Sequence, residues 1–303
     1  MNYLFLFIFL VISTFTYSQD PVFSQTINGN VNLNSALVGN DTSARLATNY
    51  RNQWSGFGAG YITSSINFSQ YISKFNGYGG IHYLNDNAFD VIKSNYISGF
   101  YSQNLKVRNM IFRPSVEIGF LSSKLDESKL TFGDMTNPQT EVIKPLNENT
   151  MKLDLNLGAI VSYKNLLIGF SAHHINRPNM GFYSTYRLPM RYSAQFSYAF
   201  NISKFRISPF AFINLQGGFQ STVGGLDFLI NKHFNLAVSY RTSDALITNI
   251  GYTNKYFSVN YSYDYTTSLL NNLNTGGTHE LGLVVKFWKV KAHQNYLPVV
   301  SVF

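Results

Sequence analysis

The feature of this sequence that most constrains its fold is a two-residue periodicity, which recurs in segments of about ten residues. In residues 151–163 the odd positions hold Met, Leu, Leu, Leu, Ala, Val and Tyr, and the even positions are mostly polar or small. Successive side chains of a β-strand point to opposite faces, so this pattern predicts a strand with one apolar and one polar face. Residues 192–200, 257–265 and 281–287 show the same alternation.

The composition indicates which solvent these strands face. Charged residues make up 13% of the chain and aromatic residues 16%, whereas a soluble domain usually has about 25% charged residues. Polar residues interrupt every apolar stretch after residue 18, so no segment is long enough for a transmembrane helix. A closed barrel is the other structure that satisfies the backbone within a bilayer. We therefore predict an all-β protein, a transmembrane antiparallel β-barrel.

The alternating segments predict about fourteen strands, and an even number is usual for bacterial single-chain barrels. Segments 91–104 and 205–216 alternate poorly, so twelve or sixteen strands are alternatives. The expected strands are 44–54, 60–72, 77–86, 91–104, 109–123, 150–164, 166–176, 189–202, 205–216, 221–231, 234–243, 246–254, 257–267 and 278–288.

The connections between these strands predict the sidedness of the barrel. The longer ones are 84–93, 122–150, 176–189 and 267–278, and the alternate connections are short. Short turns are typical of the periplasmic rim, so we expect a basic ring with an aromatic girdle there. The net charge of +8 is spread around this ring, whereas a nucleic-acid site would concentrate it in one groove. Each short turn carries a lysine beside an aromatic or apolar residue: Lys74, Lys106, Lys164, Lys204, Lys232 and Lys255.

The charged residues within the strands are expected to avoid lipid. A lysine or arginine that faces lipid at the bilayer midplane costs about 2–4 kcal/mol. The charged strand residues lie on the non-apolar parity and should point into the lumen: Lys152, Asp154, Arg191, Asp264, Glu280 and Lys286.

The two ends of the chain fall outside the predicted barrel, which spans residues 44–288. Residues 1–18 have the layout of a secretory signal peptide, with an apolar core at 4–12, although a short first helix or amphipathic anchor is an alternative. Residues 19–43 form an N-terminal periplasmic or plug segment, which either fills the lumen or docks in the periplasm. Residues 289–303 form a tail, in which Leu297 to Phe303 is an alternative last strand. The chain has no Cys, so it has no lipid-attachment cysteine.

The sequence offers few candidates for catalysis. His173 and His174 are adjacent in an expected strand, which would send their rings to opposite faces. His82 is expected near the outer rim, with Asp86 four residues on, and no hydrolase motif accompanies either residue. In the long outer loop Asp126, Glu127 and Asp134 match no calcium loop. We therefore predict no enzyme, no cofactor and no metal site.

Several strings, taken in order, resemble the PorP/SprF family of Bacteroidetes type IX secretion membrane proteins. Residues 19–25 (QDPVFSQ), 33–39 (LNSALVG) and 50–54 (YRNQW) resemble the opening of the family, and 276–281 (GGTHEL) resembles its closing strand. Gly77-Tyr78-Gly79-Gly80, followed by Asn85-Asp86, resembles the next hairpin. Two departures are the Ser at position 35, where members usually have Pro, and the C-terminal tail.

The resemblance implies a barrel of the type IX secretion and gliding machinery. It would contact a periplasmic lipoprotein and help to secrete or anchor a large surface adhesin through the adhesin's C-terminal domain. A porin-like channel for small solutes is the alternative function. The family-like motifs give the expected partner-binding residues: Asp20, Pro21, Phe23, Ser24, Gln25, Asn34, Tyr50, Arg51, Asn52, Gln53, Trp54, Gly276, Gly277, Thr278, His279 and Glu280.

Two roles are open for one of these motifs. Arg51, Asn52 and Gln53 could hydrogen-bond an extended peptide in or beside the lumen. Alternatively, Tyr50 and Trp54 are girdle residues and Arg51 pairs with a lumen carboxylate.

Overall fold

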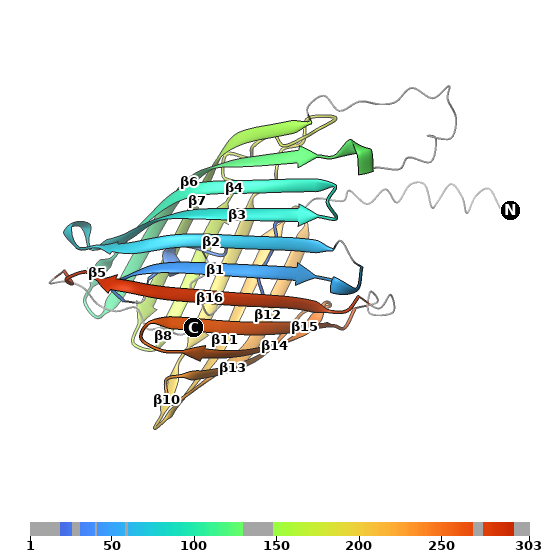
Figure 1. Cartoon of the computed structure of the whole chain (residues 1–303). Coiled ribbons are helices and arrows are strands. Elements are labelled where there is room, and N and C mark those ends of the chain that lie inside the picture. The colour runs from blue at the N-terminus through green and yellow to red at the C-terminus, as the bar shows by residue number, and fades with distance from the viewer. Residues whose placement is uncertain are drawn as a thin grey trace, which may run out of the picture.

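The structure is a computed structural model that describes residues 19–25, 31–39, 41–57, 60–129, 148–268 and 275–293. It is a closed β-barrel whose long strands are seen from the side in Figure 1. Fourteen strands form the ring: β1 (Ser43–Gln53), β2 (Tyr61–Ile72), β3 (Gly77–Ala88), β4 (Ile92–Gln103), β6 (Met110–Leu125), β7 (Asn149–Tyr163), β8 (Leu166–His173), β9 (Arg191–Tyr198), β11 (Phe205–Gln216), β12 (Phe219–Ile230), β13 (Phe234–Arg241), β14 (Ala245–Thr253), β15 (Phe257–Thr266) and β16 (Thr278–Lys289).

The ring has up-and-down topology, because each strand pairs antiparallel with its neighbours along the chain. The first and last strands, β1 and β16, pair with each other, and β9 pairs with β11. The predicted antiparallel barrel of about fourteen strands is therefore confirmed.

The helices of the described residues are four 3-10 helices: η1 (Ser35–Leu37), η2 (Ser55–Phe57), η3 (Ser73–Phe75) and η4 (Glu127–Lys129). No helix in this part of the chain is long and apolar enough to cross a membrane.

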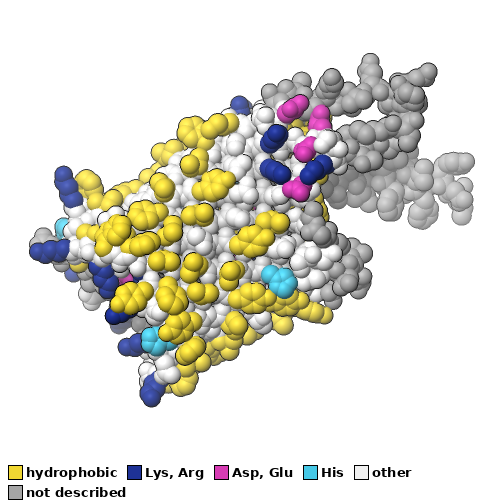
Figure 2. Space-filling model, viewed as in Figure 1, with side chains coloured by type: hydrophobic (Ala, Val, Ile, Leu, Met, Phe, Trp, Pro, Cys, Tyr) yellow, Lys and Arg dark blue, Asp and Glu magenta, His cyan; other side chains and the backbone are white. Residues whose placement is uncertain are grey.

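The alternation within a strand separates lipid-facing from lumen-facing side chains. In β13, Phe234, Leu236, Val238 and Tyr240 are exposed on the outer wall, whereas Asn235, Ala237, Ser239 and Arg241 are buried in the lumen. Apolar side chains cover the outer wall in Figure 2. This is the inverse of a soluble protein, and it matches a barrel whose outer surface meets hydrocarbon.

Two short strands continue wall strands after a break. β5 (Leu105–Val107) follows β4, and β10 (Phe200–Ile202) follows β9. At the breaks, the backbone N–H groups of Asn104 and Ala199 donate to Asn76 and Asn165 in the preceding turns. The predicted strand 189–202 runs across the second break, whereas the predicted strand 91–104 ends at the first.

One expected long connection is short in the structure. The segment 84–93 was expected to be a loop, but β3 runs on to Ala88 and β4 begins at Ile92. Phe89 and Asp90 adopt left-handed backbone conformations, with φ of 51° and 59°, which allow a tight turn there.

The six lysine-bearing turns lie at one end of the barrel, as expected from the up-and-down order of the strands. Dark blue side chains mark this end at the left of Figure 2, whereas acidic and basic side chains mix at the other end. Three of these lysines lie over a neighbouring ring, with Nζ 5.6 Å from the Phe75 centroid, 5.3 Å from that of Tyr163 and 4.6 Å from that of Tyr256. We call this end the lysine rim.

The described residues of 19–25 and 31–39 run inside the lumen. Hydrogen bonds join Ser24 to β15 and β16, Asn34 to β9 and Val38 to β6. Hydrophobic clusters support the same position, since Phe23 packs with Leu84 and Tyr96, and Val22 packs against Phe210 and Phe212. We call these described residues the lumen segment.

The contacts of the lumen segment explain why two strand segments alternate poorly in sequence. In β4, Tyr96 and Phe100 point inward and pack on Phe23 and on Val31. In β11, Phe210 and Phe212 point inward and are buried beside Val22. Apolar residues appear on both parities of these strands because one face meets lipid and the other meets the lumen segment. At the C-terminal end, the alternative strand 297–303 lies outside the described residues.

Candidate functional site

The lumen holds Ser24 and Gln25 through a buried network of charged side chains. Their backbone N–H groups donate to the two oxygens of the Glu280 carboxylate, at 2.8 and 3.1 Å. The Ser24 hydroxyl accepts from Arg51 and Arg241, at 2.6 and 2.7 Å, and donates to Asp264 at 2.6 Å.

The charges in this network compensate one another. Arg51 lies 3.2 Å from both Asp264 and Glu280, and Arg241 lies 3.2 Å from Asp264. All four side chains are buried. Buried charges of this kind are tolerated only when they are paired and hydrogen-bonded. The lumen therefore holds the backbone of Ser24 and Gln25 with fixed charges that neutralise one another.

Asn34 is the second attachment point of the lumen segment. Its amide nitrogen donates to the carbonyl oxygens of Ala159 and Phe170 and to the Gln195 side chain, at 3.3, 3.1 and 3.0 Å. Its side-chain oxygen caps η1 by accepting from the Ala36 N–H. A Cβ atom at Gly158 would collide with Asn34 Oδ1, so this wall position requires glycine.

Arg113 forms the third attachment. Its Nη1 atom donates to the carbonyl oxygens of Ala36, Val38 and Gly39, at 3.3, 2.6 and 3.0 Å. The guanidinium also lies 4.6 Å from the ring centroid of Tyr78. Gly39 has a φ of 80°, and any side chain at this position would meet Tyr78. Arg113 therefore holds the lumen segment shortly before the chain enters β1.

Asp20 is anchored by two cations near the end opposite the lysine rim. Its Oδ2 atom lies 2.7 Å from His174 Nε2 and 3.2 Å from Arg191 Nη1, and His174 Nδ1 lies 2.9 Å from Asp154. Burial alone would lower the pKa of His174, but the Asp20 and Asp154 carboxylates outweigh it and raise the pKa to about 9. Burial would raise the pKa of Asp20, but His174 and Arg191 hold it well below its usual range.

The positions of two histidines differ from those expected. The expectation that His173 and His174 face opposite sides of the wall is wrong, because β8 ends at His173 and His174 has a left-handed φ of 57°. Both rings are buried in the lumen, with centroids 6.3 Å apart. His173 Nε2 lies 3.2 Å from the Leu33 carbonyl, so both histidines contact the lumen segment.

His82 lies in the middle of β3, with only 2% of its surface exposed, and not near the rim. Its Nε2 atom lies 3.2 Å from Ser65 Oγ, and its Nδ1 atom lies 3.3 Å from Glu117 Oε1. This order of hydroxyl, imidazole and carboxylate resembles a nucleophilic triad. The three groups form a buried polar chain across the lumen face of the wall, and neither Ser65 nor His82 is among the residues that line the cavity described next.

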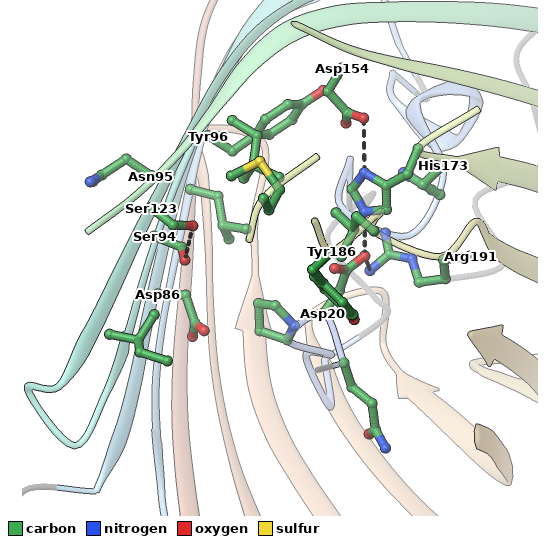
Figure 3. Close-up of a pocket in the computed structure, with 18 of the residues that line it drawn as sticks. Asp20, Asp86, Ser94, Asn95, Tyr96, Ser123, Asp154, His173, Tyr186 and Arg191 are labelled. Carbon is green, nitrogen blue, oxygen red and sulfur yellow. Dashed lines mark hydrogen bonds and ion pairs between the residues drawn. The ribbon is translucent and has the colours of Figure 1, made fainter. Parts of the chain in front are cut away.

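A cavity of about 420 Å3 lies between the start of the lumen segment and the wall. Its lining comes from residues 19–21 and 32, from β3, β4, β6, β7, β8 and β9, and from the 174–190 connection. Figure 3 shows Asp86, Ser94 and Ser123 on one side, Arg191 and His173 on the other, and Asp20 and Tyr186 between them. We call it the outer cavity, because it lies toward the end opposite the lysine rim.

The pairing of β1 with β16 brings two of the family-like motifs together. In this register Arg51 is opposite Glu280, Asn52 is opposite His279, and Gln53 is opposite Thr278. The strings 50–54 and 276–281 are therefore adjacent on the wall, a proximity that alternation alone cannot predict.

The residues of these motifs divide between the two faces of the wall. Arg51, Thr278 and Glu280 are buried in the lumen. Tyr50 is exposed on the outer wall, and His279 Nδ1 lies 2.7 Å from the Tyr261 hydroxyl on that face. Of the two roles considered for Arg51, the structure shows pairing with lumen carboxylates.

A turn after β1 lies beside the chain that leads into β16. Trp54 has a φ of 60° and packs edge-on against Tyr61. Gly276 and Gly277 both have a φ of 70°, and the Ser55 N–H donates to the Gly277 carbonyl at 3.2 Å. These glycines let the incoming chain turn beside the end of β1.

Of the residues expected inside the lumen, Asp154, Arg191, Asp264 and Glu280 are buried there. Lys152 shares their parity but is exposed. Arg113 and Arg241 were not singled out from the sequence, although each lies on the polar parity of its strand. The parity of a charged residue within a strand was the signal that could have found them.

The acidic residues of the outer loop have other partners. Asp126 accepts from the Ser128 hydroxyl at 2.6 Å, and Glu127 accepts from the Tyr183 hydroxyl at 2.8 Å. Asp134 lies outside the described residues. Within the described ranges, no group of three His, Asp or Glu side chains is placed to hold a metal ion.

The closed ring, the apolar outer wall and the polar lumen define this protein as an outer-membrane β-barrel. The model of the family described as type IX secretion system membrane protein PorP/SprF matches residues 15–285. The chain therefore belongs to the PorP/SprF family of type IX secretion system membrane proteins.

Similar solved structures include other membrane channels and barrels. The Acinetobacter baumannii outer membrane protein Omp33 is 10% identical, with a TM-score of 0.49 over 82% of this chain and 100% of that chain. The CymD monoaromatic hydrocarbon channel is 10% identical, with a TM-score of 0.49 over 92% and 96%. The P. putida toluene transporter TodX is 8% identical, with a TM-score of 0.45 over 86% and 92%. No curated protein matches the sequence.

Proposed function

We propose that this barrel serves the type IX secretion and gliding machinery by helping to secrete or anchor a large surface adhesin through the adhesin's C-terminal domain. The observation that carries the proposal is a lumen whose side chains bind the backbone of a polypeptide segment. Glu280 accepts two backbone N–H groups, and Arg113 donates to three backbone carbonyls. Recognition of the backbone in this way is independent of sequence and suits a protein that handles another polypeptide.

The residues of the family-like motifs have a defined place in this proposal. Asp20, Phe23, Ser24, Gln25 and Asn34 are held by the lumen wall. A secreted segment that uses the same wall groups replaces these contacts, so partner binding and release of the lumen segment are coupled.

The lysine rim is the proposed contact for a periplasmic lipoprotein. Its six turn lysines are exposed, and none of the ion pairs among the described residues uses one of them. An exposed ring of unpaired cations attracts an acidic protein surface and raises the rate of association.

Affinity purification from native outer membranes tests this function. We expect the barrel to retain an adhesin C-terminal domain and a lipoprotein. A rim variant with Lys164→Glu, Lys204→Glu and Lys232→Glu should lose the lipoprotein but keep the adhesin, because only the cationic surface is reversed. The matched control, Lys124→Glu, Arg177→Glu and Arg187→Glu, reverses three exposed charges at the opposite end and should keep both partners.

Deletion of the gene distinguishes the proposal from the porin alternative. We expect general permeability to stay intact while one secreted or surface-attached protein is lost from the cell surface. Normal surface display together with slower uptake of small solutes would instead show that the barrel is a porin.

We also propose that residues 1–18 are a signal peptide and that the lysine rim faces the periplasm. The mass of the purified protein should then correspond to a chain that begins at Gln19. The chain has no Cys of its own, so single cysteines report sidedness. On intact cells, an impermeant thiol reagent should label Ser184→Cys and spare Lys164→Cys. The reverse labelling pattern would invert the orientation.

A further inference from the structure

The outer cavity is an open space beside the start of the lumen segment, and the network around Ser24 does not use it. Its volume of about 420 Å3 falls within the range of small-molecule pockets. Apolar side chains form part of its lining, among them Leu84, Leu121 and Leu188. Two further lining residues, Met180 and Tyr186, come from the connection that follows β8.

The charges that line the outer cavity are not balanced. The cations His174 and Arg191 are both engaged by Asp20, and His174 is also engaged by Asp154. Asp86 faces the cavity from β3 and accepts from the Thr63 hydroxyl through Oδ1, at 2.6 Å. None of the ion pairs among the described residues includes Asp86, so its carboxylate has no countercharge in this part of the chain.

A second acceptor in the lining is unused. Asp154 is fully buried, and its Oδ2 atom has no hydrogen-bond partner among the described residues. In Figure 3 this side chain lies at the top of the cavity, on the side away from Asp86. This oxygen is fully buried, so a ligand in the cavity does not reach it, and Asp154 contributes negative charge to the cavity rather than a hydrogen bond.

We propose that the outer cavity binds a peptide segment in which one lysine or arginine is flanked by apolar residues. The cation pairs with Asp86, and the apolar side chains contact Leu84, Leu121 and Leu188. Lys152 does not compete for this place, since it is exposed and does not line the cavity. The inference rests on the proposed function only for the source of the peptide, which would be the secreted protein.

The test uses the purified full-length barrel in detergent and three capped tripeptides, Leu-Lys-Leu, Leu-Gln-Leu and Leu-Glu-Leu, with affinities measured by calorimetry or saturation-transfer NMR. We expect the lysine peptide to bind about tenfold more tightly than the glutamine peptide, and the glutamate peptide to bind most weakly. Asp86→Asn should remove the preference for lysine. Asp90→Asn, an exposed loop carboxylate four residues away, should preserve it.

A second variant tests the location. Ser94→Tyr places a ring into the cavity from β4 and should abolish the binding of all three peptides. Equal affinity for the lysine and glutamine peptides, a lysine preference that survives Asp86→Asn, or binding that survives Ser94→Tyr would each overturn the proposal. Hexylammonium tests whether an amine on an apolar chain is enough for binding. If the natural ligand is a peptide, hexylammonium should bind more weakly than the lysine peptide. None of these outcomes depends on co-purification, so failure here leaves the proposed function standing.

Discussion

Replacing Arg51 with methionine is expected to release the start of the lumen segment. Arg51 is the cation shared by Asp264, Glu280 and the Ser24 hydroxyl, so its loss leaves two buried carboxylates with one remaining cation, Arg241. Removing one partner of a buried pair typically costs about 3–5 kcal/mol. A single cysteine at Val22, partly buried against Phe210 and Phe212, should react with a thiol reagent at least about tenfold faster in the variant.

The control for this experiment is Arg187→Met, which removes an exposed guanidinium at the end opposite the lysine rim. It should leave the rate of labelling at Val22→Cys unchanged. An equal, slow rate in Arg51→Met and in the parent would show that the hydrophobic contacts of Val22 and Phe23, not the charge network, hold the segment.

Raising the pH through about 9 is expected to weaken the anchor at Asp20. The pKa of His174 is raised from 6.5 to about 9, so the stability that it contributes is complete below pH 6.5 and is lost as the pH rises through 9. A shift of this size corresponds to about 3 kcal/mol. The pKa of Asp20 is lowered, so its contribution is present above pH 3.8 and is lost only as the pH falls below that value.

Urea unfolding of the barrel in lipid vesicles at pH 6, 8 and 10 measures this effect. The free energy of unfolding of the parent should fall between pH 6 and 10, whereas that of His174→Gln should begin lower and lack this decrease. His233→Gln, at an exposed histidine on the lysine rim, is the matched control and should behave like the parent. A His174→Gln variant with the same pH dependence as the parent would assign the decrease to other groups.

The strands could be predicted from the sequence because the environment of each wall residue follows from its position within its own strand. Each wall residue faces either lipid or lumen, so period-two alternation marks strands such as β7 and β13 directly. The lysine-bearing turns likewise identified one rim. Alternation weakened only where both faces of a strand are apolar, as at Phe210 and Phe212, which pack on Val22.

The contacts of the site were harder to predict from the sequence, because they join distant parts of the chain. Ser24 bonds to Glu280 across 256 residues of sequence, and nothing local to either residue indicates the other. The two rings at His173 and His174 were misplaced because one left-handed residue at the end of β8 reverses the expected parity. A pattern of strict alternation carries no information about where a strand ends.

The pairing of the first strand with the last has a consequence for biogenesis. The backbone N–H groups of Ser24 and Gln25 donate to Glu280 on β16, and their side chains donate to β15. These two strands are synthesised last, whereas the segment that needs them is synthesised before the whole wall. Until β16 is in place beside β1, the N–H groups of Ser24 and Gln25 have no acceptor on the wall strands. In a barrel that is still being assembled, the start of the lumen segment is therefore not yet bound. Binding of this segment to Glu280 therefore coincides with closure of the ring. An incomplete barrel and a complete one differ in whether the start of the lumen segment is bound, and this difference is available to the machinery that inserts the barrel.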